Sequence, residues 1–291
     1  NLHFSQRVFD DLQTKDVVSW TALMSGYEQH GNGKAALKIF LQMEESTSVK
    51  PNEVTYVSVL NAITPLGTLD SGSSIHTNII NHGYESNVYV ASALVDMYAK
   101  CGNMDDACVM FDKLSNPDTV TWNTLIDGLA QNGYSEKALD WFEKMKQENM
   151  MIDSTTILAV LSACNHAGLV HEGCHHFSSM NHLHGIIPIA EHYACIIDIL
   201  GRSGHLEAAI KLLQKLPTKP SLSSWMVILS ACRLHGNVDV AKQAIESIMK
   251  VEPQKETAYV LLSNIYALEE VKHNRSEFDL NHCDTYNIPS M

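Results

Sequence analysis

The chain repeats itself, and this repetition limits the folds that it can adopt. The stretch DVVSWTALMSGYEQHG at residues 16–31 returns 102 positions later as DTVTWNTLIDGLAQNG at 118–133, with the same aromatic residue, apolar spacing and final glycine. Glycines recur every 31 to 36 residues, and a residue no larger than alanine stands five positions after each. Such a period is typical of helical or other solenoids. The glycines are Gly31, Gly67, Gly102, Gly133, Gly168, Gly204 and Gly236, and the small residues are Ala36, Gly72, Ala107, Ala138, Gly173, Ala209 and Ala241.

Each repeating unit has the pattern of a helical hairpin. Apolar residues at helical spacing precede the glycine, and a second apolar stripe follows it. In the unit from residue 119 these stripes are Trp122, Leu125, Ile126 and Leu129, then Ala138, Leu139, Phe142 and Met145. A hairpin cannot bury its apolar face alone, so successive units must stack. We therefore predict an all-α protein, an α-solenoid of stacked helix-turn-helix repeats that forms a tetratricopeptide-like superhelix.

Composition excludes several classes of protein. A hydrophobic fraction of 45% and a charged fraction of 18% indicate a folded chain. The net charge of −13 disfavours coating of nucleic acid through bulk positive potential, so a polyanionic partner must be held by local groups. No apolar run approaches the roughly 18 residues of a membrane span, and NLHFSQRVFD at the amino terminus has no targeting pattern. The seven cysteines contain no C-x-x-C pair, which favours small buried thiols over a disulfide framework or zinc knuckle.

The intervals between glycines alternate in triplets, so equivalent units lie three apart. VSWTALMSGY, VYVASALVDMYAKCG, LSACNHAGLVHEG and EHYACIIDILGRSG belong to different positions of the triplet. These phrases resemble those of plant pentatricopeptide repeat proteins of the subclass that alternates normal, long and short repeats. The resemblance covers about residues 1–267. A generic tetratricopeptide array lacks this alternation.

The resemblance implies a division of the chain into repeats. The segments SSWMVILSACRLHGNVDVAKQAIESIMKVEP and ETAYVLLSNIYA resemble the extension motifs that follow the last triplet in organellar RNA-editing factors. The predicted segments are 1–16 (partial short repeat), 17–52 (normal), 53–87 (long), 88–118 (short), 119–153 (normal), 154–189 (long), 190–221 (short), 222–255 (first extension motif), 256–270 (truncated second extension motif) and 271–291 (irregular tail).

Members of this family read single-stranded RNA one base per repeat, through the fifth residue of the first helix and the last residue of the repeat. On this chain the implied pairs are Thr21 with Asn52 for adenine, Ser92 with Asp118 for guanine, and Asn123 with Asp153 for uracil. The same residue types cap helices, so a cap role for Asp118 and Asp153 stays open.

Further positions complete the implied RNA site. The second residue of a repeat clamps a base face, and Val18, Val54, Tyr89 and Val120 fit this role, whereas Thr155 and Glu191 do not. Three other pairs have apolar first members and are expected to act as spacers or protein-binding surfaces: Val57 with Asn87, Leu158 with Ile189, and Ala194 with Ser221. The implied footprint is 5′-A-N-G-U-3′, read parallel to the chain.

The resemblance implies a role in organellar C-to-U RNA editing, in which the chain recognises the site and a deaminase acts in trans. We find no H-x-E with C-x-x-C and no terminal Asp-Tyr-Trp, so we expect no enzyme activity, no cofactor and no metal in this chain. The expected location is the mitochondrion, with the chloroplast as the alternative, and the targeting segment is expected to be absent from this sequence.

Two other functions are also consistent with the sequence, a zinc peptidase and a protein-binding scaffold. His171-Glu172-Gly173-Cys174-His175 matches the H-E-x-x-H signature of zinc peptidases, although Gly173 is already explained as a small packing residue. The chain could also be a protein-binding scaffold that reads no RNA, which the acidic balance favours.

Overall fold

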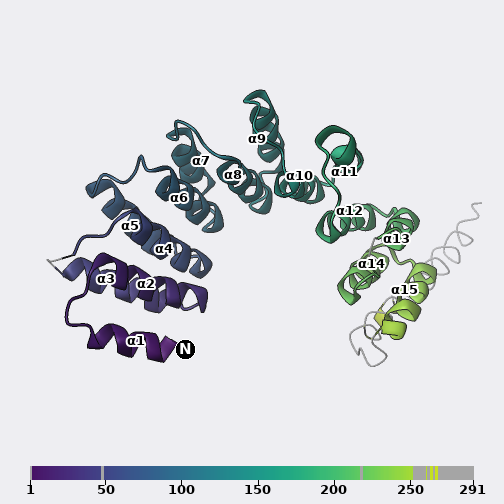
Figure 1. Ribbon diagram of the computed structural model, residues 1–291. Coiled ribbons are helices and arrows are strands. Elements are labelled where there is room, and N and C mark those ends of the chain that lie inside the picture. Colours follow the sequence, from purple (N-terminus) through teal and green to yellow (C-terminus); the bar gives the residue numbers. More distant parts are fainter. Residues whose placement is uncertain are drawn as a thin grey trace, which may run out of the picture. The chain divides into compact units, whose positions relative to one another are not determined.

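The computed structural model describes residues 2–46, 49–216 and 219–251, together with positions 260, 263, 264, 266 and 267. Across these residues the protein is helical and contains no strand (Figure 1). The elements in chain order are α1 (Leu2–Asp11), α2 (Val17–Gln29), α3 (Gly33–Glu45), α4 (Glu53–Ile63), the 3-10 turn η1 (Thr64–Leu66), α5 (Leu69–Asn81), α6 (Val88–Lys100), α7 (Met104–Asp112), α8 (Thr119–Gln131), α9 (Ser135–Gln147), α10 (Ser154–Ala167), α11 (Val170–His184), α12 (Ala190–Arg202), α13 (Leu206–Gln214), α14 (Leu222–His235) and α15 (Val238–Val251).

The α-helices are arranged as consecutive hairpins. Every segment predicted as a complete repeat holds two α-helices, and the first of them begins at the first residue of the segment. Helices α14 and α15 form one more hairpin within 222–255. The all-α fold of helix-turn-helix repeats is therefore confirmed.

The chain divides into two compact units, residues 1–163 and 164–291. In the first unit α2 packs on α3 and α4, α4 packs on α6, and α6 packs on α8, so the first helices of successive repeats form one row (Figure 1). In the second unit α12 packs on α13 and α14. Contacts between sequence neighbours are those that a solenoid requires.

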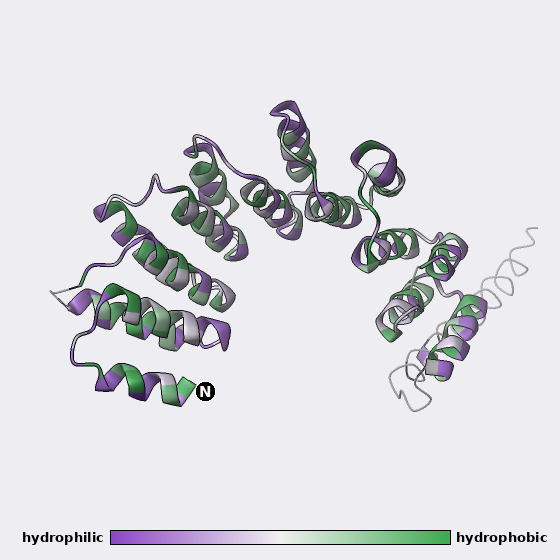
Figure 2. Ribbon diagram, viewed as in Figure 1, coloured by the Kyte–Doolittle hydropathy of each residue, from purple (hydrophilic) through white to green (hydrophobic). Residues whose placement is uncertain are grey.

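The hydrophobic core follows the predicted stripes. In the unit from residue 119 the members of both stripes are buried except Leu139, which is half-buried. Figure 2 shows that the helices combine hydrophobic and hydrophilic residues, as amphipathic helices do. Burying each side chain of this size stabilises the fold by about 1.5–3 kcal/mol, before the conformational entropy that it loses.

The recurring glycines make the turns that the period predicts. All seven have positive φ, for example 84° at Gly133 and 61° at Gly67. This left-handed backbone region is favourable for glycine because it has no Cβ. It ends the first helix and turns the chain back into the second.

The small residues of the second helices allow close packing, as predicted. A Cβ placed on Gly72 would lie 2.3 Å from Met97 Sδ, and one placed on Gly173 would lie 2.9 Å from Ile199 Cδ1. Gly33, at the start of α3, is packed more tightly still. A Cβ there would lie 2.0 Å from the backbone oxygen of Ala62, which cannot move away as a side chain can.

Other sequence predictions have simple outcomes. Cys164 and Cys232 are fully buried, as expected of small core thiols, and burial raises the pKa of their thiols to about 11 and about 12. The other described cysteines are only half-buried: Cys101, Cys108, Cys174 and Cys195. No helix in the described part of the chain is both long and apolar enough to cross a membrane. The tail predicted at 271–291 and most of the second extension motif at 256–270 lie outside the described residues.

Candidate functional site

The predicted pairs occupy one repeated position in the structure. The first members lie early in the first helices α2, α6 and α8. The second members immediately precede the next first helix, and each accepts a hydrogen bond from the backbone N–H three residues on. The nitrogen-to-oxygen distances are 3.0 Å from Thr55 to Asn52, 2.9 Å from Thr121 to Asp118 and 2.8 Å from Thr156 to Asp153. The cap role left open by the sequence is thus present at Asp118 and Asp153.

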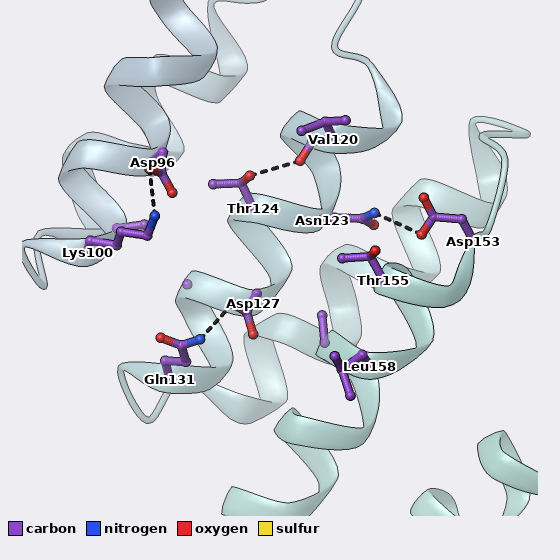
Figure 3. Close-up of a pocket in the computed structure, with 13 residues that line it drawn as sticks. Asp96, Lys100, Val120, Asn123, Thr124, Asp127, Gln131, Asp153, Thr155 and Leu158 are labelled. Atoms are coloured by element: carbon purple, nitrogen blue, oxygen red, sulfur yellow. Dashed lines mark hydrogen bonds and ion pairs between the residues drawn. The ribbon is translucent and has the colours of Figure 1, made fainter. Parts of the chain in front are cut away.

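Asn123 and Asp153 are in direct contact. Asn123 Nδ2 donates to Asp153 Oδ1 over 3.0 Å, and Asn123 is only 5% exposed (Figure 3). A carboxylate oxygen accepts and cannot donate, so the amide group must turn its NH2 toward Asp153. This fixes the orientation of the amide. Its oxygen, Asn123 Oδ1, is buried and has no hydrogen-bond partner among the described residues.

Thr21 and Asn52 are joined through a third residue, Thr55. Thr21 Oγ1 lies 2.8 Å from Thr55 Oγ1, and Thr55 Oγ1 lies 2.9 Å from Asn52 Oδ1. Thr55 is fully buried and Thr21 is 8% exposed. The two predicted partners therefore belong to one hydrogen-bonded chain without touching each other.

Ser92 and Asp118 are joined in the same way through Thr121. Ser92 Oγ lies 2.7 Å from Thr121 Oγ1, which donates to Asp118 Oδ1 over 2.7 Å. Ser92 also lies 2.8 Å from the backbone oxygen of Val88, one turn earlier in α6. The two hydroxyl protons can make only two of these three contacts into hydrogen bonds at one time.

The threonines at the third position of α4, α8 and α10 were missed by sequence reasoning. Their signal is present in the sequence as N-x-x-T at 52–55 and as D-x-x-T at 118–121 and 153–156. This spacing is typical of a cap and its N3 residue, so it predicts a helix start. The lateral contacts of Thr55 and Thr121 to the preceding first helix appear only when the helices are stacked.

A groove of about 380 Å³ lies beside the third pair, within residues 1–163. Figure 3 shows Val120 and Thr155 on opposite sides of the bonded amide and carboxylate of Asn123 and Asp153. Leu158 lines the same groove. Thr155, which does not fit the apolar clamp pattern, therefore occupies the clamp position of the following repeat.

The four predicted clamp residues are large apolar side chains in contact with solvent. Val18 is 68% exposed, Val54 55%, Tyr89 74% and Val120 67%. All four stand at the second position of a first helix. Each therefore lies within one helical turn of the fifth residue of the same helix. Exposed apolar side chains at a regular interval offer surfaces for flat ligands.

The groove beside Asn123 does not carry positive potential. It is lined by three carboxylates and one ammonium group, those of Asp96, Asp127, Asp153 and Lys100. Lys100 Nζ lies 2.9 Å from Asp96 Oδ2, and Gln131 donates to Asp127 over 2.6 Å. Hydrogen bonds and stacking, rather than bulk charge, must therefore hold a ligand here.

The pairs with apolar first members do not form this arrangement. Asn87 caps α6 by accepting from the backbone of Tyr89 and Val90, at 3.0 and 3.2 Å, but the third residue of that helix is valine. At the start of α12 the backbone N–H of Ile189 donates to His192 Nδ1 over 3.2 Å. Ser221 caps α14 in the last case.

The H-E-x-x-H match lies on α11. His171, Glu172 and His175 are exposed there, and Gly173 packs against Ile199. No group of three or more potential metal ligands occurs among the described residues.

Comparisons with known proteins identify similar families and structures. The PPR repeat family matches residues 15–64 and 117–166, and the PPR repeat matches 89–116 and 191–219, which together make up more than half of the chain. Among curated proteins of Arabidopsis thaliana, the mitochondrial pentatricopeptide repeat-containing protein At2g03880 is 40% identical over 260 residues. This alignment covers 89% of this chain and 41% of that protein.

A second mitochondrial relative, At1g06140, is 39% identical over 90% of this chain and 47% of its own length. The chain thus spans less than half the length of these relatives. Among solved structures, the pentatricopeptide repeat protein PPR10 in complex with an 18-nt psaJ RNA element has a TM-score of 0.78 and 20% identity. The match covers 91% of this chain and 40% of PPR10.

Proposed function

Because the chain belongs to the pentatricopeptide repeat family, we propose that it binds single-stranded RNA and selects bases with side chains of successive first helices. The orientation of the Asn123 amide carries this proposal. A buried amide oxygen without a partner is costly, and Asn123, whose NH2 group is fixed by Asp153, lines the groove. Such a site is built for a ligand that presents complementary polar groups.

Uracil complements Asn123. Its N3–H can donate to the unpartnered Oδ1, and its O4 can accept the second proton of Nδ2. Cytosine has the reverse pattern, an acceptor at N3 and a donor at N4. The amide cannot turn over to suit cytosine, because Asp153 requires the NH2 group on its side.

The other two pairs fit purines by the same logic. At Asn52 the oxygen is engaged by Thr55, which leaves Nδ2 to donate to N1 of adenine. At Asp118 the corresponding atom is the carboxylate oxygen Oδ2, an acceptor that suits N1–H of guanine. The proposed footprint remains A-N-G-U, with the exposed clamp residues against the base faces.

Affinity must come from stacking and hydrogen bonds. The net charge is −13, and the charged groups that line the groove at Asn123 are three carboxylates and one ammonium group, so electrostatic attraction to phosphate is weak. Stacking of a base on an aromatic side chain such as Tyr89 contributes about 1–3 kcal/mol. We therefore expect modest affinity with strong dependence on sequence.

The biological role is proposed by extension from the family. We propose that the protein recognises an organellar RNA upstream of a target cytidine and that a deaminase acts in trans. The mitochondrion is the first candidate because relatives carry that name, and the chloroplast is the alternative. Conversion of the cytidine only when both the chain and a separate deaminase are supplied would support this role, and conversion by the deaminase alone would refute it.

Base selection is tested by binding at fixed salt. Labelled RNAs carrying A-N-G-U in a constant single-stranded flank are changed one base at a time, and the dissociation constant is measured by fluorescence anisotropy. We expect a loss of about 5-fold or more for a wrong base at the first, third or fourth position, and no preference at the second. Equal weak binding to all sequences would refute base reading and leave the protein-binding scaffold as the better account.

A further inference from the structure

Thr55 connects the two members of the first pair, Thr21 and Asn52, through hydrogen bonds that those two residues do not make with each other. It lies between Thr21 on α2 and Asn52 before α4, and it contacts both through one hydroxyl group. We propose that Thr55 is a positioning residue that fixes the direction of the Thr21 hydroxyl and thereby the base that Thr21 accepts. This inference rests on the proposed RNA-reading function and adds a third residue to the pair.

The direction follows from counting protons. The backbone N–H of Thr55 can only donate, so the atom of Asn52 that faces it over 3.0 Å must be the amide oxygen. The Thr55 hydroxyl lies 2.9 Å from the same oxygen and must give its single proton to it. Thr55 Oγ1 is then an acceptor toward Thr21, whose proton is committed to the 2.8 Å contact.

Thr21 therefore presents only lone pairs to a ligand. An acceptor at Thr21 beside a donor at Asn52 Nδ2 complements N6–H and N1 of adenine. Guanine offers the opposite pattern at both atoms, an acceptor at O6 and a donor at N1–H. Thr55 accordingly accounts for one of the two mismatches that exclude guanine, and Asn52 accounts for the other.

The second pair has the same hydrogen-bonded link through a threonine, and its first member also has a second possible acceptor for its proton. Thr121 must donate to the carboxylate of Asp118, so the proton of Ser92 goes either to Thr121 or to the backbone oxygen of Val88. Both choices leave Ser92 as an acceptor, so at this pair guanine is matched through its two donors, N1–H by Asp118 Oδ2 and N2–H by Ser92, and not through O6. Ser92 thus keeps its direction even without Thr121, whereas no second acceptor for the hydroxyl of Thr21 is found among the described residues.

The third pair supplies a matched control. Thr156 donates to Asp153 over 3.0 Å, as Thr55 does to Asn52, and it is equally buried. It does not stand between the pair members, because Asn123 reaches Asp153 directly. Removing the hydroxyl of Thr156 therefore alters an equivalent helix cap without breaking a hydrogen-bonded connection between pair members.

The test compares Thr55→Val with Thr156→Val in the full chain, using RNAs with adenine or guanine at the first footprint position and uracil or cytosine at the fourth. In Thr55→Val the freed Thr21 hydroxyl can donate to guanine O6, so one mismatch is removed. We expect the preference for adenine over guanine to fall by about 5-fold or more. We expect Thr156→Val to keep its preference for uracil, and Thr55→Ser, which retains the hydroxyl, to keep the preference for adenine.

Melting temperatures separate this effect from loss of structure, and Thr55→Ala replaces Thr55→Val if the valine variant does not fold. An unchanged adenine preference in a folded Thr55→Val or Thr55→Ala protein overturns the role of Thr55 while base reading stands. An equal relaxation in Thr156→Val also overturns it, since the effect would then belong to the cap. A wild-type protein without base preference overturns the proposed function and this inference together.

Discussion

Replacing Asn52 with aspartate changes one atom of the site, and we expect it to change the preferred base from adenine to guanine. Asn52 Oδ1 already accepts from the backbone and hydroxyl of Thr55, and Asn52→Asp keeps that acceptor. Only Nδ2 changes, from a donor to an acceptor. The cap of α4 is retained, and a carboxylate at a helix N-terminus adds about 0.3–1 kcal/mol of stability.

The magnitude follows from one hydrogen bond. In Asn52→Asp the hydrogen bond from Nδ2 to adenine N1 is lost, and two acceptors face each other in its place. This weakens binding of adenine by about 1–3 kcal/mol, or about 5- to 150-fold in the dissociation constant. Guanine N1–H gains the partner that adenine loses. The adenine-to-guanine ratio is therefore expected to change by about 25-fold or more in favour of guanine.

Fluorescence anisotropy with A-N-G-U and G-N-G-U RNAs at constant salt measures this ratio. Asn87→Asp is the matched control, because Asn87 caps α6 in the same way but is the last residue of a repeat in which the first pair member is Val57. We expect no base switch in the control. An unchanged ratio in a folded Asn52→Asp protein would show that Asn52 is a helix cap and does not contact the base.

Two further substitutions and one labelling measurement test other parts of the structure. Gly33→Ala places a Cβ 2.0 Å from the Ala62 carbonyl oxygen and is expected to lower the free energy of unfolding by about 1–3 kcal/mol or more, whereas Gly26→Ala, where a Cβ would lie 3.9 Å from Leu2, is not. Chemical denaturation measures both variants, and equal stability contradicts the packing. With a pKa of about 11, Cys164 is almost entirely neutral thiol at pH 8 and gains reactivity only as the pH approaches that value. Alkylation of the native protein, followed by mass spectrometry, is therefore expected to label Cys164 slowly. Rapid labelling would contradict its burial. Asp153→Ala removes the acceptor that orients the neighbouring amide, so the preference for uracil over cytosine is expected to fall by about 5-fold or more in the binding assay, and a retained preference refutes that orientation.

The fold was predictable because its signals are local. The recurring glycine marks the turn, and the apolar residues around Trp122 mark the helical faces, so both helices of each unit can be read from one stretch of chain. The close approach of Gly33 to Ala62 was not predictable, because it depends on the contact between α3 and α4. The period alone does not report how far two stacked helices approach.

The candidate site was predicted in part, and the missing part has a physical reason. The pairs came from the resemblance, and the direct bond between Asn123 and Asp153 brings one of them together. Thr55 and Thr121 were missed because a threonine three residues after Asn or Asp already has a sufficient local explanation as part of a cap. Their second contact joins residues 34 and 29 positions apart, which no local pattern reports.

The residue at the third position of a first helix varies together with the first member of the preceding pair. Threonine stands there after Thr21, Ser92 and Asn123, whereas Val90 follows Val57 and His192 follows Leu158. Ser224 after Ala194 is the exception. In two of the three polar cases, Thr55 and Thr121, the hydroxyl contacts the first member of the pair, whereas Thr156 does not, because Asn123 reaches Asp153 directly. The hydroxyl is therefore expected to matter where the first member is itself a hydroxyl group that needs direction.

The association can be tested by building a fourth reading pair. Asn87 already caps α6, with its Oδ1 3.2 Å from the nitrogen of Val90, so Val57→Thr combined with Val90→Thr reproduces the arrangement of Thr21, Thr55 and Asn52. We expect the double variant to prefer adenine at the second footprint position by about 5-fold or more. Val57→Thr alone adds a hydroxyl whose proton is not directed, so its preference is expected to be weaker. Equal preferences in the single and double variants would mean that the first member selects the base without help from the third residue.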